Sequence, residues 1–350
     1  MAARDGPELR SARNVPALLA YEPDASRTGL RPRPQKAQTS LVPQDAIAFD
    51  AFRLTLVQCR WHIAANMAAT AESREPEGLH QLRVALRRLR VALASFGGEF
   101  RTPQLEALKL RAKFLAGQLA PARDLDVFVT ELFEPAASAN GSKDAFAVLR
   151  ARAEAARRRA WNDATQQVAG PRFRMFMADF ADAIDRGVWP LIDAQRKGAS
   201  KGIVALQMPA RAVAERMLTH RRRQACKSAK GLETLSDAGR HELRISLKKL
   251  RYTAEFFVPF FERSRVQKFV SRLSRMQDVL GALNDVAVAR SILEALVSAD
   301  EPRPQARSDL SFAAGIVYGW HLERAAHTWH DAVARWKKFS DTKEFWTTAQ

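Results

Sequence analysis

From about residue 44 onward, apolar residues recur three and four positions apart along most of the chain. Around Leu82, Leu86, Leu89 and Leu93 this spacing places the apolar side chains on one face of a helix and the polar ones on the other. No stretch shows the strict alternation that is typical of a strand. The pattern predicts an all-α fold, cut into helices by breaks at 74–76, 97–98, 140–141, 170–171, 198–202, 236–239 and 300–304.

The two ends of the chain lack this pattern. Residues 1–43 are rich in Pro, Arg, Ser and Ala and follow neither a helical nor an alternating period. We therefore expect a flexible basic arm over 1–43, a helical domain over 44–340 and a C-terminal tail over 341–350.

A long internal repeat lies within the helical domain. The segment His80–Arg90 (HQLRVALRRLR) reappears 161 residues later as His241–Arg251 (HELRISLKKLR). The repeat predicts two homologous helical halves, 44–197 and 205–340, that pack around a pseudo-two-fold axis. The same offset carries Phe96 onto Phe257, Phe100 onto Phe261, and Arg123-Asp124 onto Asn284-Asp285.

Each copy of the repeat carries a stripe of cations. With about 100° of turn per residue, Arg83, Arg87 and Arg90 fall within a sector roughly 80° wide, on a different face from the leucines. Arg244, Lys248 and Arg251 repeat the stripe in the second half. Guanidinium groups stay charged and fork towards paired oxygens, so such a row suits a chain of phosphates.

A solvated charged face is the alternative interpretation of one such stripe. Like charges four residues apart destabilise a helix, no acidic residue is interleaved on the stripe, and the arrangement occurs twice, which together favour an anionic ligand. His80 and His241 begin the stripes, either as donors to phosphate or as partners in helix-terminal hydrogen bonds. Asp124 and Asp285, with their neighbours Arg123 and Asn284, are expected to orient nearby arginines through paired hydrogen bonds.

Composition agrees with an anionic partner. The chain has 56 Lys and Arg against 38 Asp and Glu, a formal net charge of +18, and such a surplus attracts polyanions. Cys59 and Cys226 form no disulfide or metal-binding pattern, which suits the cytoplasm. No apolar run is long enough for a signal peptide or a membrane span.

Catalytic and metal-binding signatures are missing from the sequence. There is no Gly-rich phosphate loop, no GxSxG, no HExxH and no carboxylate cluster suited to Mg²⁺. His80 and His241 have no second histidine or cysteine one turn away. We expect no enzymatic activity, no metal and no cofactor.

Four motifs resemble the CHAD domain (conserved histidine α-helical domain): HQLRVALRRLR, LAPARDLDVF, HELRISLKKLRYTAEFF and MQDVLGALND. The resemblance implies two helical bundles whose basic residues line a groove or pore that binds inorganic polyphosphate. It also implies association with polyphosphate granules, and their proteins, in bacteria. The implied ligand contacts are His80, Arg83, Arg87, Arg90, His241, Arg244, Lys248 and Arg251. Arg88 and Lys249 lie at the edge of the stripes. The resemblance implies four further contacts less strongly: Lys113, Arg222, Arg223 and Arg275.

Two other functions stay open at this stage. Nucleic acid would be attracted by the same charge, but Tyr252 is the only aromatic residue that flanks a stripe and could stack on a base. The arm resembles the tail of a CYTH phosphohydrolase domain, which leaves an accessory role in phosphate hydrolysis. However, the ExExK signature of that domain is absent, since Glu75-Pro-Glu77 lacks the lysine.

Overall fold

The computed structural model describes residues 32–96, 102–140, 143–186, 206–298 and 303–347. These residues form helices and connecting segments, with one isolated β-bridge between Ile47 and Pro209 and no strand among them. The all-α prediction is confirmed. Residues 1–31 of the predicted arm, Phe100, and the junction of the two halves at 187–205 lie outside the described residues.

The first half of the chain contributes a series of helices with short breaks. Thr102 accepts a hydrogen bond from Leu105 N at the start of one of them, and Pro103 follows it as the first helical residue. The elements are α2 (Ala48–Ala71), α3 (Pro76–Phe96), α4 (Pro103–Gln118), α5 (Ala120–Val127), the π-helix η1 (Phe128–Phe133), α6 (Glu134–Ala139), α7 (Lys143–Ala169) and α8 (Pro171–Arg186).

The second half repeats much of this order at the offset of 161 residues, so that α12 corresponds to α3, and the start of α14 to the start of α7. The chief difference is α13, which runs unbroken where the first half divides into α4 and α5 at Leu119. The elements are α11 (Ala210–Ser228), the 3₁₀ turn η3 (Leu232–Thr234), α12 (Asp237–Phe256), the 3₁₀ turn η4 (Val258–Phe260), α13 (Arg263–Ser298) and α14 (Pro304–Ser340).

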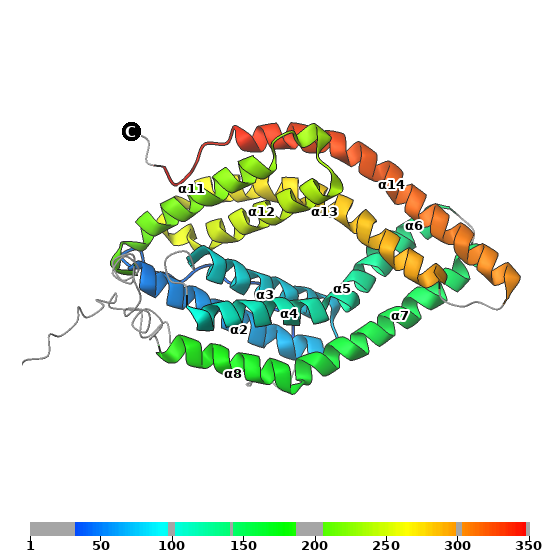
Figure 1. Cartoon of the computed structure of the whole chain (residues 1–350), viewed down its shortest axis with the longest axis horizontal. Coiled ribbons are helices and arrows are strands. Elements are labelled where there is room, and N and C mark those ends of the chain that lie inside the picture. The colour runs from blue at the N-terminus through cyan, green and yellow to red at the C-terminus, as the bar shows by residue number, and fades with distance from the viewer. Residues whose placement is uncertain (1–31, 97–101, 141–142, 187–205, 299–302, 348–350) are drawn as a thin grey trace, which may run out of the picture.

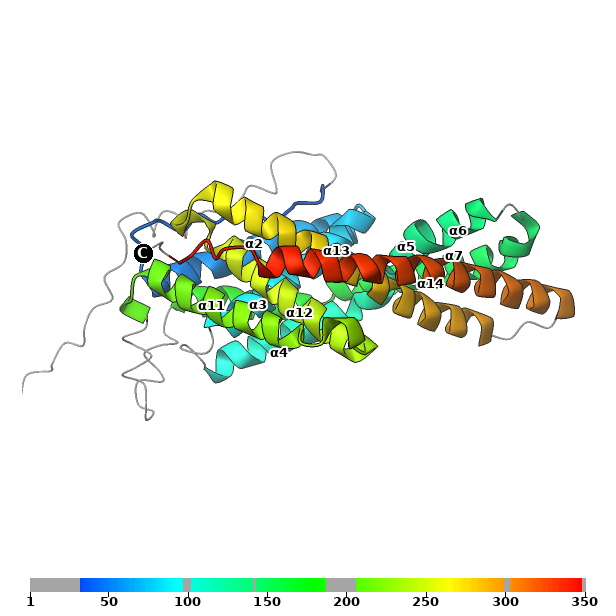
Figure 2. The same cartoon turned by 90° about the horizontal axis from the view of Figure 1, so that it is seen from above.

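The two halves lie against each other along the length of an elongated molecule. In Figure 1, α2, α3, α4 and α8 form one side and α11, α12 and the start of α13 the other. Towards the far end, the outer parts of α13 and α14 lie beside α6 and α7 (Figures 1 and 2), and they share an apolar core that includes Phe128, Phe146, Leu293 and Leu310. This core therefore needs both halves.

Helices α3 and α12 pack across each other near their C-terminal ends. Phe96 and Phe257, which the repeat makes equivalent, pack against each other with ring centroids 5.6 Å apart and ring planes tilted by 57°. Nearby, Ser95 Oγ lies 3.3 Å from Thr253 Oγ1. Contact between equivalent residues is the arrangement expected at a pseudo-two-fold axis.

Part of the predicted arm is packed on the helical domain, and the prediction of a free arm is wrong for residues 32–43. Gln35 N donates to Asn66 Oδ1 over 3.0 Å, Ser73 Oγ donates to the carbonyl of Pro32 over 2.7 Å, and Val42 is buried. The backbone groups of this extended segment are bonded by side chains of α2 and the turn after it. A single extended segment of this kind has no periodicity to detect.

The predicted C-terminal tail is also packed over its described part. Trp346 is only 1 % exposed and donates from Nε1 to Thr219 Oγ1 over 2.9 Å. Arg222 donates to the carbonyls of Ser340 and Thr342 over 2.7 and 2.9 Å, and it pairs with Glu344 at 3.3 Å. The segment after α14 thus closes the core of the second half.

Replacing Trp346 with alanine is expected to lower the free energy of unfolding by about 3–5 kcal/mol, because a fully buried ring would leave a cavity. Urea unfolding followed by circular dichroism measures this. The exposed neighbour Thr347 is the control, and Thr347→Ala should cost less than about 0.5 kcal/mol. Equal stability of the Trp346→Ala variant and the wild type would show that the segment does not close the core.

Candidate anion-binding cavity

A cavity of about 360 Å³ lies between α3 and α12, on the N-terminal side of their crossing, and is closed by α5, η1 and α13. It combines cations of both halves, as the repeat predicted. Its lining consists of His80, Arg83, Val84, Arg87, Arg123, Asp124, Val127, Glu131, Leu132, Arg244, Lys248, Asn284, Asp285 and Val288.

The arginines of the cavity are held in place but only partly neutralised. Arg83 Nη1 donates to the carbonyl of Ala116 over 2.6 Å, and burial lowers the pKa of Arg83 to about 10. Burial also lowers the pKa of Arg244, whose Nε is buried without a hydrogen-bond partner. Within the described part of the chain, Arg87 and Arg244 form no ion pair. Their charges are therefore available to a ligand.

Lys248 is the most strongly perturbed group of the cavity. Burial, followed by the charges of Arg87, Arg244 and Arg251, lowers its pKa to about 6. A lysine whose pKa has fallen this far is mostly neutral at pH 7 in the empty cavity. An anion placed beside it would restore the charged form.

The two aspartates of the cavity act differently from the prediction. Burial raises the pKa of both Asp124 and Asp285, while Arg83 and Arg244 respectively lower it. Among the described residues, neither carboxylate forms a hydrogen bond or ion pair with an arginine. The aspartates therefore influence the arginines through space and do not orient them by paired hydrogen bonds. Arg123 instead faces Glu131, 3.6 Å away.

The two repeat histidines occupy unlike positions. His80 lines the cavity, and burial, followed by the charge of Arg123, lowers its pKa. His241 is exposed, lies outside the lining, and places Nδ1 3.3 Å from Asn284 Oδ1. Within the described residues, no group of three His, Cys, Asp or Glu side chains is suited to a metal ion.

Arg88 and Arg251 were predicted as ligand contacts but lie on another side of the crossing. Both pair with Glu255, and the Arg251 Nε to Glu255 Oε1 distance is 3.3 Å. Arg88 also stacks over Phe256 with 5.0 Å between its guanidinium carbon and the ring centroid. The partners of Arg88 come from the other half of the chain, so the sequence period alone does not reveal them. Arg90 and Lys249 lie beyond the cavity and outside its lining.

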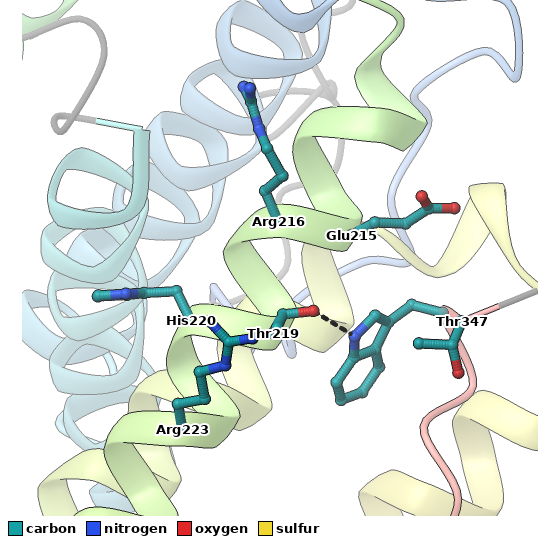
Figure 3. A pocket seen from close by; sticks show the side chains of 7 residues that line it. Glu215, Arg216, Thr219, His220, Arg223 and Thr347 are labelled. Atoms are coloured by element: carbon teal, nitrogen blue, oxygen red, sulfur yellow. Dashed lines mark hydrogen bonds between the residues drawn. The ribbon is translucent and has the colours of Figure 1, made fainter.

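The four residues that the family resemblance implied less strongly as ligand contacts also lie outside the cavity. Lys113 and Arg275 are exposed on α4 and α13, and Arg222 holds the C-terminal segment. Arg223 lines a separate hollow of about 550 Å³ between α11 and that segment. Figure 3 shows Arg216, His220 and Arg223 along α11, with Thr219 turned towards the Trp346 ring.

A second cavity of about 490 Å³ adjoins the first and shares Asp124, Asn284 and Val288 with it. The rest of its lining is largely apolar, with Leu125 and Ile292 among the side chains, and contains no lysine or arginine. The cationic lining is thus confined to one side of these shared residues. No described helix is both long and apolar enough to cross a bilayer.

Comparison with known proteins identifies one family and two solved structures that this chain resembles. The sequence profile of the CHAD domain matches residues 55–294. The crystal structure of the CHAD domain from the plant Ricinus communis is similar, with 27 % identity and a TM-score of 0.71 over 87 % of this chain and 96 % of that one. PptA from Streptomyces chartreusis shares the fold at 16 % identity and a TM-score of 0.59, over 83 % of this chain and 100 % of that one. No curated protein matches.

Proposed function

Because the chain belongs to the CHAD domain family, we propose that it is a non-enzymatic protein that binds inorganic polyphosphate in the cavity between α3 and α12. The resemblance stated from the sequence implies this ligand. It also implies a place on polyphosphate granules, beside granule proteins, in the cytoplasm.

The main support is a set of cations from both halves that have no ion-pair partner among the described residues. Arg87, Arg244 and Lys248 face one cavity without a carboxylate within ion-pair distance. Holding like charges together in a partly buried site is unfavourable, and an anion with several phosphates would relieve the repulsion. Their spread over two helices suits a ligand with repeated charges better than a single phosphate.

Nucleic acid remains the second candidate and is less well supported. The lining of the cavity contains no Phe, Tyr or Trp side chain on which a base could stack. Tyr252, the residue considered from the sequence, is buried beneath Arg88 and Arg251, with centroid distances of 5.6 and 5.2 Å. A slim chain of phosphates needs no stacking surface.

The distribution of charge favours a groove over a threaded pore. The adjoining cavity has no lysine or arginine in its lining, so a polyanion passing through it would lose every cationic contact. We infer that the ligand enters and leaves on the side of α3 and α12.

Polyphosphate binding is expected to weaken about 30- to 100-fold in an Arg87→Gln/Arg244→Gln variant, because each lost charge-assisted contact costs about 1–1.5 kcal/mol. The matched control is Arg158→Gln/Arg159→Gln, which removes the same charge from exposed positions on α7. Isothermal titration with long-chain polyphosphate at two salt concentrations measures both affinity and its salt dependence.

Equal affinity of the cavity variant and the control variant would contradict this location of the site. Displacement of bound polyphosphate by single-stranded nucleic acid, at lower phosphate concentration than the reverse, would make nucleic acid the ligand. Phosphate release in the presence of Mg²⁺ or Mn²⁺ would contradict the non-enzymatic role.

A further inference from the structure

The pseudo-two-fold axis relates two sides of the contact between α3 and α12. We call these two sides the ends of the cavity. At one end the repeat places Arg251 and Arg88, and at the other it places their equivalents, Arg90 and Lys249. Arg60 of α2 corresponds in the same way to Arg221 of α11. Each end therefore carries three cations from three helices. We call them the Arg251 end (Arg60, Arg88, Arg251) and the Arg90 end (Arg90, Lys249, Arg221).

The Arg251 end is partly neutralised by one carboxylate, Glu255, which lines a hollow of about 560 Å³ together with Arg88, Arg251, Lys36 and Arg263. Glu255 pairs with Arg88 of the other half and with Arg251 one turn earlier on its own helix. Arg88 is only 8 % exposed, so this pairing compensates a charge that would otherwise be buried alone. An anionic ligand arriving here would have to displace Glu255.

The Arg90 end has no such carboxylate. The position equivalent to Glu255 is Ala94, which is exposed on α3. Within the described part of the chain, none of Arg90, Lys249 and Arg221 forms an ion pair. Glu242 raises the pKa of Lys249 but forms no ion pair with it, so among the described residues the two ends differ in the ion pairs that Glu255 makes.

Arg221 shows how incompletely this end is compensated. It is 8 % exposed, and among the described residues its guanidinium donates to two neutral groups, Ser95 Oγ at 3.0 Å and Gln224 Oε1 at 3.1 Å. The bond to Ser95 reaches across to α3 beside the crossing. A buried guanidinium with no anionic partner is a costly arrangement that a bound anion would stabilise.

Electrostatic coupling connects this end with the cavity. Burial, followed by the charge of Arg87, lowers the pKa of Arg90, and Arg87 lines the cavity. Burial, followed by Arg221 and Arg90, lowers the pKa of Lys249. The cations therefore continue from the cavity to the Arg90 end without an intervening ion pair among the described residues.

We propose that a long polyphosphate chain leaves the cavity over Arg90, Lys249 and Arg221, because on the equivalent path Glu255 already pairs with Arg88 and Arg251. This path rests on the proposed function and adds to it the direction in which the bound chain runs. Short oligomers occupy the cavity alone, and only longer chains contact the Arg90 end.

An Ala94→Glu variant tests this path by placing a carboxylate where Glu255 stands in the other half. It should weaken binding of long-chain polyphosphate about tenfold, while affinity for tripolyphosphate stays within about twofold. The salt dependence of long-chain binding should also become shallower, by about one unit of slope or more. Ala151→Glu, at an exposed position of α7, is the control for charge.

Unchanged affinity and salt slope for the long chain in Ala94→Glu would overturn the proposed path while leaving the cavity site intact. Failure of the wild type to bind either oligomer would instead overturn the proposed function. Should Ala94→Glu lose its helical circular dichroism, Lys249→Gln takes its place, with exposed Lys268→Gln on α13 as control. The same selective loss for long chains is then expected.

Discussion

At pH 6 the protein is expected to bind long-chain polyphosphate about 50-fold more tightly than at pH 8, because binding returns a proton to Lys248. Its pKa is about 6 in the empty cavity and should approach the ordinary value of roughly 10.4 beside phosphate. Between these two values the complex holds a proton that the free protein lacks, so affinity rises as pH falls. Below pH 6 the gain levels off, since Lys248 is then charged in both states.

The groups that face Lys248 are Arg87, Arg244 and Arg251, which lower its pKa, and Asp285, which raises it. His80 has a lowered pKa in the same cavity, so its protonation acts in the same direction. Titrations in several buffers of different ionisation enthalpy measure proton uptake directly. The Lys248→Arg variant keeps its charge throughout and should lose most of the pH dependence. A wild-type affinity that is flat between pH 6 and 8 would contradict the linkage.

The empty protein is expected to become more stable when Lys248 is replaced by methionine, by about 1–3 kcal/mol at pH 7. In the folded state the pKa of Lys248 lies near 6, whereas in the unfolded chain it lies near 10.4. The unfolded state therefore binds more protons between these values, and the wild type loses stability as pH falls through this window. The full pKa shift would correspond to a larger difference in the free energy of unfolding, but water screens part of the effect at this incompletely buried side chain.

Urea unfolding at pH 7 and above pH 10 separates this effect from simple packing. The advantage of the Lys248→Met variant should shrink at the higher pH, where the lysine of the unfolded chain also loses its charge. Polyphosphate binding at pH 6 should be weaker than in the wild type. A variant that is less stable than the wild type at pH 7 would show that Lys248 contributes favourable contacts in the empty cavity.

The helices, and the face of α3 and α12 that carries the cations, could be predicted from the sequence. A period of 3.6 residues places Arg83 and Arg87 on a different face from the leucines, and the repeat predicts the same for Arg244 and Lys248. It does not determine how α3 and α12 cross. The crossing sends Arg88 towards Glu255, a partner 167 residues away, so its prediction as a ligand contact required information that no single helix contains.

The repeat also concealed differences between the halves. His80 and His241 stand at equivalent positions, yet one lines the cavity and the other is exposed. The packed segments at the two ends of the domain were missed for another reason. Gln35 is fixed by long-range hydrogen bonds to Asn66 and His62, and Trp346 by burial and one hydrogen bond to Thr219. Neither kind of contact produces a periodic signal in a short stretch of sequence.

The far core of the molecule, built jointly from η1, α6, α7, α13 and α14, has a consequence for how such a chain can diversify. If a half existed as a separate subunit, a symmetric homodimer would be needed to complete this core, and one residue would then serve both positions of the Ala94 and Glu255 pair. Joining the two copies into one polypeptide removes that constraint. Each copy can then mutate alone, so a fused chain can acquire a directional ligand path that a homodimer of identical subunits cannot encode.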